Sequence, residues 1–359
     1  MTFPAGDRGF TFVELLVALA ILTTVLAGVL YLSDSGQRLG RAQPDAADLH
    51  QRVRVVADML QRDLLMAGAA PLHGRSGGSL TNYFAPIVPA RTGARSPDPE
   101  LSWFPDRISV VYVPDGGWQA GLSADMTDTA SEVPVAAFTP GCPSAGFCGF
   151  SEGTRAVLLD SAGVGLGHEL FTVTGAVAGL AHGSPNAPFS KPYSASTAVV
   201  MPIVQRVYYF DAPTRRLMLY DGYQSDMPLV DNVVDVSFRY YAEPSPASVP
   251  QSASASCVHS PGIPPTLPLA DLGGRALRPL TPDQFRDGPV CGLSPNRFDG
   301  DLLRVRRVQV TLRFDAAAGD LRGSGASFSR PGTATSGHGY VTDYEVTFDV
   351  APRNLVPAR

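Results

Sequence analysis

The most distinct pattern in the sequence is an apolar segment near the N-terminus. Residues 10–33 read FTFVELLVALAILTTVLAGVLYLS and hold one charged side chain, that of Glu14. A helix rises about 1.5 Å per residue, so this segment is long enough to cross the hydrocarbon core of a bilayer. The small residues that a secretory signal places after its apolar stretch lie inside this one, at Ala18, Ala20 and Ala27. We therefore expect a retained transmembrane helix.

A second periodic segment follows Pro44, which is expected to interrupt or end the first helical run, and Asp45 can cap the next one. From Asp45 to Gly68 the pattern predicts an amphipathic helix that packs its apolar face against a head domain and ends near Gly68. A membrane-surface helix is less favoured, because the polar face mixes signs rather than being basic. The apolar stripe is Leu49, Val53, Val56, Leu60, Leu64 and Ala67, and most of the remaining surface is Arg52, Arg54, Asp58, Arg62 and Asp63.

Beyond Ala70 the period becomes that of β-strands, with a hairpin expected over Val204–Tyr220. There is no strand–helix–strand rhythm, so the sheets should be mostly antiparallel and the fold class α+β: a long N-terminal helical spine and a β-rich head. The strand candidates are Arg107–Val113, Thr154–Asp160, Glu169–Thr174, Ile203–Phe210, Arg216–Tyr220, Val230–Tyr241, Leu303–Phe314 and Tyr340–Val350.

These patterns divide the chain into four parts. Residues 1–9 form a short polar leader, 10–33 the transmembrane helix, 34–70 the amphipathic helix and 71–359 the head. Within the head, residues 243–268 are rich in proline and serine and are expected to form a loop that builds no core.

Composition narrows the function classes. Charged residues are 17% and hydrophobic residues 44% of the chain, which excludes a disordered protein. The net charge of -5 gives no excess of positive charge that would indicate nucleic-acid binding.

The four cysteines have neither metal-binding nor catalytic spacing and allow three pairings. They are Cys142, Cys148, Cys257 and Cys291. Four free thiols fit a cytoplasmic head; an exported head favours two disulfides, most simply between neighbours, Cys142–Cys148 and Cys257–Cys291.

Glu14 is the anomaly of the apolar segment. An acid in a membrane span is by default a functional candidate with a partner. Its simpler interpretation is a carboxylate near a helix N-terminus, where the macrodipole favours negative charge.

The residues around Glu14 carry a family resemblance. Arg8-Gly9 ends the leader, Phe10 follows, and Glu14 is the fifth residue after Gly9. This resembles the type IV prepilin signature, which implies cleavage between Gly9 and Phe10 by a prepilin peptidase and N-methylation of Phe10. In that family the glutamate attracts the terminal amine of a neighbouring subunit during assembly; a pair within one chain is also sterically possible, since one helical turn separates the two groups.

Five further segments carry a resemblance: the helix end Arg52–Gly68, and Gln205–Asp211, Leu217–Tyr220, Leu229–Val233 and Val350–Leu355 in the head. They are similar to segments of PilW-type minor pilins, which are related to J-type pseudopilins of type II secretion. The length of the chain favours the PilW type, and the absence of proline from residues 10–43 disfavours a bulk filament subunit.

Enzyme and ligand motifs are weak. The G-x-S-x-G matches at 74–78 and 149–153 lack the strand before and helix after that a nucleophile elbow needs, and 163–167 lacks a phosphate-binding helix. No metal spacing appears among His50, His73, His168, His182, His259 and His338. Turn or strand-edge roles are favoured over calcium for Asp221, Asp226, Asp231, Asp235, Asp299 and Asp301. A charged strand face is favoured over a DNA or acidic-partner site for Arg304, Arg306, Arg307 and Arg313.

The sequence therefore predicts a non-enzymatic minor pilin without cofactor or metal. It would be anchored in the inner membrane with its head outside the cytoplasm, would bind other pilins through its N-terminal helix, and would help initiate a type IV pilus near whose tip it sits. The alternatives are a type II secretion pseudopilin, a tip adhesin or DNA-uptake pilin, and a membrane-tethered hydrolase.

Overall fold

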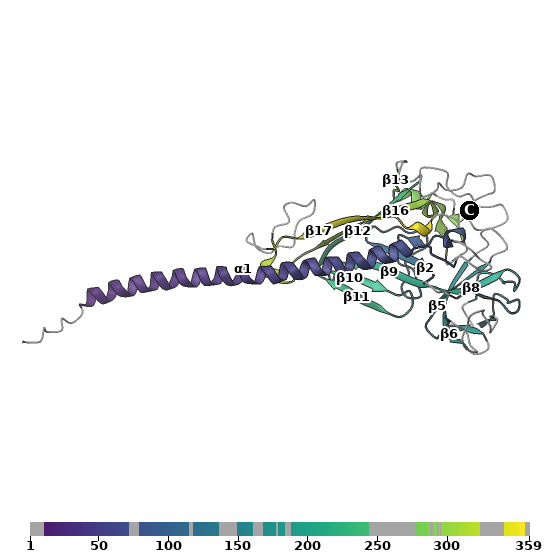
Figure 1. The fold of residues 1–359 in the computed structure, drawn as a ribbon, viewed down its shortest axis with the longest axis horizontal. Coiled ribbons are helices and arrows are strands. Elements are labelled where there is room, and N and C mark those ends of the chain that lie inside the picture. Colours follow the sequence, from purple (N-terminus) through teal and green to yellow (C-terminus); the bar gives the residue numbers. More distant parts are fainter. Residues whose placement is uncertain are drawn as a thin grey trace, which may run out of the picture. The chain divides into compact units, whose positions relative to one another are not determined.

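The structure is a computed structural model, and it divides into two compact units. One comprises Met1–Gln51 and Asp315–Tyr344, the other Arg52–Phe314 and Glu345–Arg359. A single long helix and many antiparallel strands give the expected α+β class (Figure 1). The described residues are 11–71, 79–114, 118–135, 149–160, 168–176, 179–183, 188–243, 277–287, 290–292, 294, 296–323 and 341–355.

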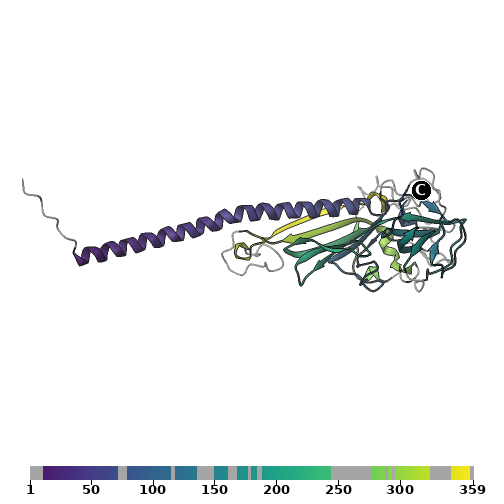
Figure 2. The same ribbon diagram turned by 90° about the horizontal axis from the view of Figure 1, so that it is seen from below.

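Helix α1 runs without a break over Phe12–Met66, through Pro44 (Figure 1 and Figure 2). The expected interruption at Pro44 is therefore wrong. A proline removes one backbone hydrogen bond, to the carbonyl four residues earlier, and a helix can continue if that carbonyl finds another partner. Here that residue is Gly40, which is exposed, so water can replace the lost donor. Asp45 caps no second helix; its carboxylate accepts a hydrogen bond from the backbone N–H of Ala318 at 3.4 Å.

The C-terminal turns of α1 belong to the second unit and bury the predicted apolar stripe. Val53, Val56, Leu60, Leu64 and Ala67 are each at most 4% exposed, and Leu49, in the first unit, is buried as well. The three- and four-residue spacing placed these side chains on one face, as expected for a helix packed on a sheet.

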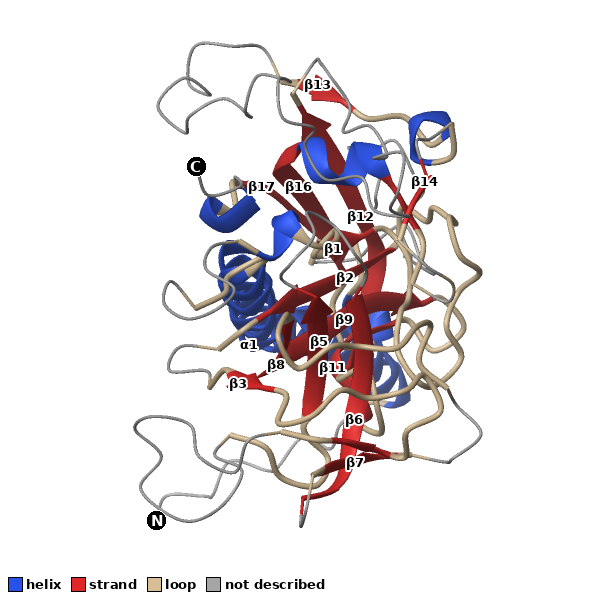
Figure 3. Cartoon of the chain, turned by 90° about the vertical axis from the view of Figure 1, so that its right-hand side faces the viewer, coloured by secondary structure: helices blue, strands red, loops and turns tan. Residues whose placement is uncertain are grey.

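The second unit is built on antiparallel sheets. In Figure 3 the long blue helix is α1 and most of the remaining regular structure is strand, drawn in red. One sheet has the order β1-β2-β9-β10-β11, with strands Ile87–Val88, Arg107–Tyr112, Val204–Asp211, Arg216–Tyr220 and Asp226–Asp231. A second has the order β3-β8-β5-β6-β7-β4, with strands Ala120–Gly121, Ala198–Pro202, Arg155–Asp160, His168–Ala176, Leu180–His182 and Glu132–Val133.

A third sheet, β13-β12-β16-β17, comprises Arg278–Pro279, Val233–Ala242, Val305–Phe314 and Tyr344–Val350, and β14 (Val290–Cys291) pairs with β15 (Phe298–Asp299). Its centre is the long antiparallel pair β12–β16, which runs from Val233 opposite Phe314 to Ala242 opposite Val305. Short 3₁₀ turns complete the described elements: η1 Leu80–Asn82, η2 Asp283–Phe285, η3 Gly300–Arg304, η4 Gly319–Leu321 and η5 Arg353–Leu355.

The strand predictions hold for β2, β5, β6, β9 and β10, including the hairpin of β9 and β10. The strand expected over Val230–Tyr241 is instead the end of β11 and most of β12, because Asn232 adopts a left-handed φ of 59° and turns the chain between them. The strand expected from Leu303 begins at Val305, because Asp299 caps the 3₁₀ turn η3. The strand expected from Tyr340 begins at Tyr344 among the described residues.

Candidate functional site

The N-terminal end of α1 is a capping box formed by Thr11 and Glu14. Glu14 Oε2 accepts hydrogen bonds from the Thr11 backbone N–H and from the Thr11 hydroxyl, both at 2.9 Å. In return, Thr11 Oγ1 accepts the Glu14 backbone N–H at 3.3 Å. This reciprocal arrangement satisfies two of the donors that a helix start leaves without partners. Glu14 was predicted from the sequence and Thr11 was not, although the spacing T-x-x-E over residues 11–14 signals a capping box.

The capping box leaves part of the Glu14 carboxylate available. The side chain is exposed, and within the described residues its second oxygen, Oε1, accepts no hydrogen bond. A carboxylate offers about four lone-pair sites, so a cationic donor can still bind there. Gly9 and Phe10, the expected cleavage and methylation positions, lie outside the described residues.

The helix after Glu14 has the surface of a membrane span. Residues Phe12–Asp34 have a mean hydropathy of 2.6, and none of this span is buried within the chain. Its two threonine hydroxyls are satisfied within the helix: Thr23 and Thr24 both donate to the carbonyl of Ala20, at 3.0 and 2.8 Å. A bilayer requires this, because lipid offers no partner to a polar group. The apolar surface therefore needs lipid or other helices around it.

The other end of α1 is fixed in the second unit by a buried polar cluster. Asp63 is 7% exposed, and its carboxylate accepts hydrogen bonds from the hydroxyls of Tyr112 at 2.9 Å and Tyr208 at 2.5 Å. The prediction that Asp63 lies on the polar surface of the helix is therefore wrong. Burial, followed by the Asp63 charge, raises the pKa of Tyr112 to about 12 and that of Tyr208 further. Helix α1, β2 and β9 thus meet at one satisfied carboxylate.

The arginines of β16 do not form a charged outer face. Arg306 is 1% exposed; its Nε donates to Glu243 Oε1 at 2.6 Å, and its Nη1 donates to the carbonyls of Leu303, Val305 and Leu355. Arg313 is buried too. The expectation of an exposed arginine strand is therefore wrong, because β16 is central in its sheet and a buried guanidinium is tolerated when it is paired.

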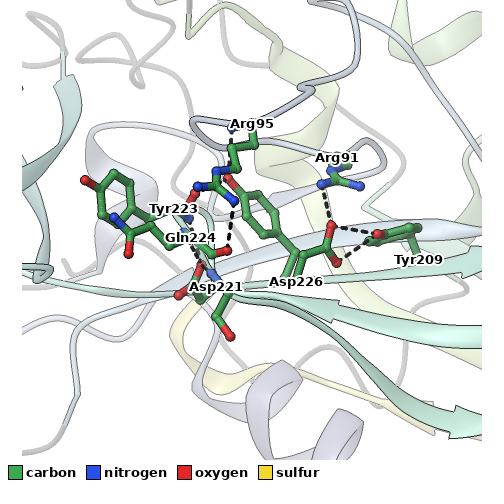
Figure 4. A network of polar contacts seen from close by, with 9 residues as sticks. Arg91, Arg95, Tyr209, Asp221, Tyr223, Gln224 and Asp226 are labelled. Atoms are coloured by element: carbon green, nitrogen blue, oxygen red, sulfur yellow. Dashed lines mark hydrogen bonds and ion pairs between the residues drawn. The ribbon is translucent and has the colours of Figure 1, made fainter.

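Most of the acids near β10 and β11 have structural partners (Figure 4). Asp221 Oδ1 accepts three backbone N–H groups, those of Tyr223, Gln224 and Ser225. Asp226 accepts the Tyr209 hydroxyl and pairs with Arg91 at 2.8 Å, and Asp231 pairs with Arg216. These contacts shape a turn and hold two strand edges, the role that the sequence favoured over calcium binding.

A second acidic group consists of Asp287, Asp299 and Asp301, which each offer a carboxylate oxygen within 4.8 Å of the others. Asp299 caps η3, and Asp301 forms an ion pair with Arg304 at 2.6 Å. Both carboxylates are therefore used by the fold, and we build no metal site on them.

The remaining motifs show no catalytic arrangement in the described residues. Ser151 of the second G-x-S-x-G match lies in a turn before β5, where its hydroxyl contacts Thr154, and a strand follows it rather than a helix. The first match, the glycines of 163–167, His73, His259 and His338 lie outside the described residues, as does loop 243–268 apart from Glu243. His50 packs edge-on against Tyr344, and His182 bonds to the carbonyl of Ala130.

Of the four cysteines, only Cys291 lies in the described part of the chain, buried in β14. Cys142, Cys148 and Cys257 lie outside it, so their pairing stays a prediction.

Comparisons with known proteins agree with the N-terminal geometry. The prokaryotic N-terminal methylation motif matches residues 5–30. A relative, the pilin-like protein PilA3 of Thermus thermophilus, is 38% identical over 98 residues, which are 27% of this chain. The match spans only 41% of that relative's length. No solved structure matches the chain.

The chain thus carries a prepilin-type methylation motif and is similar over part of its length to a pilin-like protein. Together with the apolar helix and the antiparallel head, these similarities support a type IV pilin-like protein.

Proposed function

We propose that this chain is a non-enzymatic minor pilin of the PilW type, which helps initiate a type IV pilus and sits near its tip. The prepilin peptidase would cut between Gly9 and Phe10, and methylation of the Phe10 amine would follow. The chain would wait in the inner membrane with its head outside the cytoplasm and then enter the filament. The observation that carries this proposal is the fully exposed apolar helix that follows a capped Glu14.

The mechanism rests on burial of that helix among other pilin helices. Its large side chains, such as Leu15, Leu19 and Leu22, are half or more exposed in the single chain. Packing them against neighbouring helices removes apolar surface from lipid and gains close contacts. The free Oε1 of Glu14 would accept the Phe10 amine of a neighbour, while Oε2 stays in the capping box. The capping box would thus orient the Glu14 carboxylate before a neighbouring pilin binds.

The first prediction is that Glu14→Gln impairs filament initiation and leaves processing intact. Glutamine keeps the side-chain shape and can still cap the helix, but it lacks the charge that pairs with an amine in an apolar core. We expect the number of pili per cell to fall roughly tenfold or more, because a buried amine without its counter-charge is strongly disfavoured. Pili are counted by electron microscopy, and cleavage is followed by the mass of the membrane form.

Thr11→Val is the matched control, because it removes the capping hydroxyl and keeps the Glu14 charge. It should weaken initiation much less than Glu14→Gln. Normal piliation with Glu14→Gln would show that pairing of Glu14 with a neighbour's amine is not the docking mechanism of this subunit.

Cleavage tests the prepilin assignment itself. If Gly9 is replaced by a bulky residue, cleavage should stop, and uncut protein in the wild type would refute the assignment.

A type II secretion pseudopilin is the alternative from the same machinery, and both proposals use the same N-terminal helix. Deleting the gene separates them: loss of pili with normal secretion supports the minor pilin, and the reverse supports the pseudopilin. The tip-adhesin, DNA-uptake and hydrolase alternatives have no described residues in their favour.

A further inference from the structure

The head holds a cavity that lies apart from the capping box of Glu14 in sequence. It encloses about 460 Å³ and lies entirely within the second unit. Its walls come from the loops before β2 and from β6 and β15, and they include Phe84, Glu100, Ser102, His168 and Phe298. A volume of this size falls in the range of small-molecule sites, which are mostly apolar with a few placed polar groups.

One wall of the cavity is aromatic. The rings of Phe84 and His168 stack with centroids 4.3 Å apart and planes 16° from parallel. The ring of Phe298 is 6.4 Å from that of His168 between centroids and is tilted from it by 58°. Burial lowers the pKa of His168 to about 3, so its ring is neutral and behaves as an aromatic surface at ordinary pH. Such a wall suits a planar apolar ligand.

Four of the five charged residues on the cavity wall are paired with an opposite charge, and the fifth, Asp299, accepts a hydrogen bond from the backbone N–H of Asp301. Arg91 pairs with Asp226 at 2.8 Å, Asp98 with Arg107 at 3.0 Å, and Glu100 with Arg297 at 2.6 Å. A charged ligand would therefore enter without a counter-ion, which is costly in a low-dielectric site. The ligand should be uncharged.

Three polar atoms on the wall are nevertheless buried without a hydrogen-bond partner among the described residues: Glu100 Oε1, Ser102 Oγ and His168 Nδ1. His168 is 5% exposed. Buried polar groups are normally satisfied, and each one that is not has a cost that a ligand can remove. Glu100 Oε1 can only accept, so it calls for a ligand N–H or O–H.

From this combination we infer that the cavity binds a neutral, planar aromatic molecule with a hydrogen-bond donor, its ring lying against the Phe84–His168 wall and its N–H or O–H donating to Glu100. Arg297 holds the other carboxylate oxygen of Glu100, through both Nε and Nη2, and so fixes the acceptor in place. The inference does not depend on the proposed function.

Full-length protein in detergent is titrated with a fluorinated indole and with its N-methyl derivative, which lacks the donor. Fluorine NMR follows binding, with protein-free micelles subtracted. We expect saturable binding of the indole and affinity about tenfold or more weaker for the N-methyl compound, since a hydrogen bond to a charged acceptor is lost. Equal affinity of the two compounds, or no saturation above the micelle signal, would overturn the inference, and neither result depends on a variant that must fold.

Glu100→Met then tests the acceptor, because methionine is of similar length and has no oxygen to accept the ligand's N–H. It should weaken indole binding about tenfold and leave N-methylindole binding unchanged, which erases the preference. Glu132→Met is the control, because Glu132 is an exposed glutamate of β4 that does not line the cavity. A preference that survives Glu100→Met would refute the assigned acceptor and with it the proposed site.

Discussion

At the scale of single residues, the informative side chains are the buried polar ones. Asp63, Glu243 and Arg306 are buried and each forms hydrogen bonds with named partners. Buried charges are tolerated only because those partners are present. Removing one partner should therefore lower the free energy of unfolding by more than the lost hydrogen bond alone, because the other group stays buried without a partner.

The second prediction concerns Asp63. Asp63→Ala leaves the hydroxyls of Tyr112 and Tyr208 buried without an acceptor, so the free energy of unfolding of the head should fall by about 2–4 kcal/mol. Urea unfolding followed by tryptophan fluorescence measures it, because both tryptophans, Trp103 and Trp118, lie in the second unit.

Asp58→Ala is the control for that experiment, since Asp58 is exposed on the same helix. It should change the unfolding free energy by less than about 0.5 kcal/mol. Adding Tyr112→Phe and Tyr208→Phe to Asp63→Ala should recover part of the loss by removing the orphaned hydroxyls. A loss equal to that of Asp58→Ala would show that the cluster contributes nothing to stability.

The third prediction is an acid-dependent loss of stability through His168. The folded pKa is lowered to about 3 while the unfolded one stays near its ordinary value, so below about pH 6.5 the unfolded state binds more protons. Stability should then fall with decreasing pH, and this histidine accounts for about 2 kcal/mol between pH 7 and pH 5. His168→Phe keeps the stacked ring and should remove that part of the slope. If the wild type and His168→Phe lose the same stability over this interval, His168 is not buried neutral.

At the scale of elements, the end of α1 depends on Gly68. Its φ of 77° is left-handed, and a Cβ there would lie 3.0 Å from the carbonyl oxygen of Asn354 and 3.1 Å from Pro86. The predicted glycine stop is thus confirmed, and it has two reasons: the conformation favours glycine, and η5 packs against this position.

The fourth prediction follows from that packing. Gly68→Ala should lower the unfolding free energy of the head by about 1–3 kcal/mol, since strain in φ adds to the displacement of η5. Thermal unfolding followed by tryptophan fluorescence serves as the measurement. Gly183→Ala is the matched control, because its Cβ would meet only an ordinary contact, 3.8 Å from Thr174. Equal melting temperatures for the two variants would contradict the assigned role.

The elements also show what the sequence can predict. The stripe from Val53 to Ala67 and the hairpin of β9 and β10 were predicted because their signals are local: periodic burial and turn residues. Asp63 was misplaced because its burial depends on two tyrosine hydroxyls far along the chain. Arg306 was misplaced for the same reason, since only the pairing of β16 with a strand on either side makes its position central.

At the scale of the whole molecule, the methylation motif could be predicted from the sequence, because its residues are contiguous, whereas the assembly role of Glu14 stays a prediction. Glu14 was singled out from its position alone, and the structure adds that Thr11 orients it. The cavity could not be predicted: its walls come from segments between Phe84 and Leu302, whose proximity depends on the packing of separate sheets.

The last prediction is that the four cysteines are oxidised to disulfides, because the head is expected to lie outside the cytoplasm. If the apolar helix anchors the chain with its head outside the cytoplasm, the head meets an oxidising compartment and its four cysteines should form two disulfides. Thiol labelling of denatured, unreduced protein should then find no free thiol, and labelling after reduction should find four. Mass spectrometry of unreduced peptides tests the expected pairs, Cys142–Cys148 and Cys257–Cys291. Another pairing would correct the connectivity alone, whereas four thiols labelled without reduction would place the head in a reducing compartment and contradict the proposed orientation. Expression without the transmembrane segment, in a reducing cytoplasm, is the control: the same labelling should then detect all four thiols, which shows that oxidation follows export rather than purification.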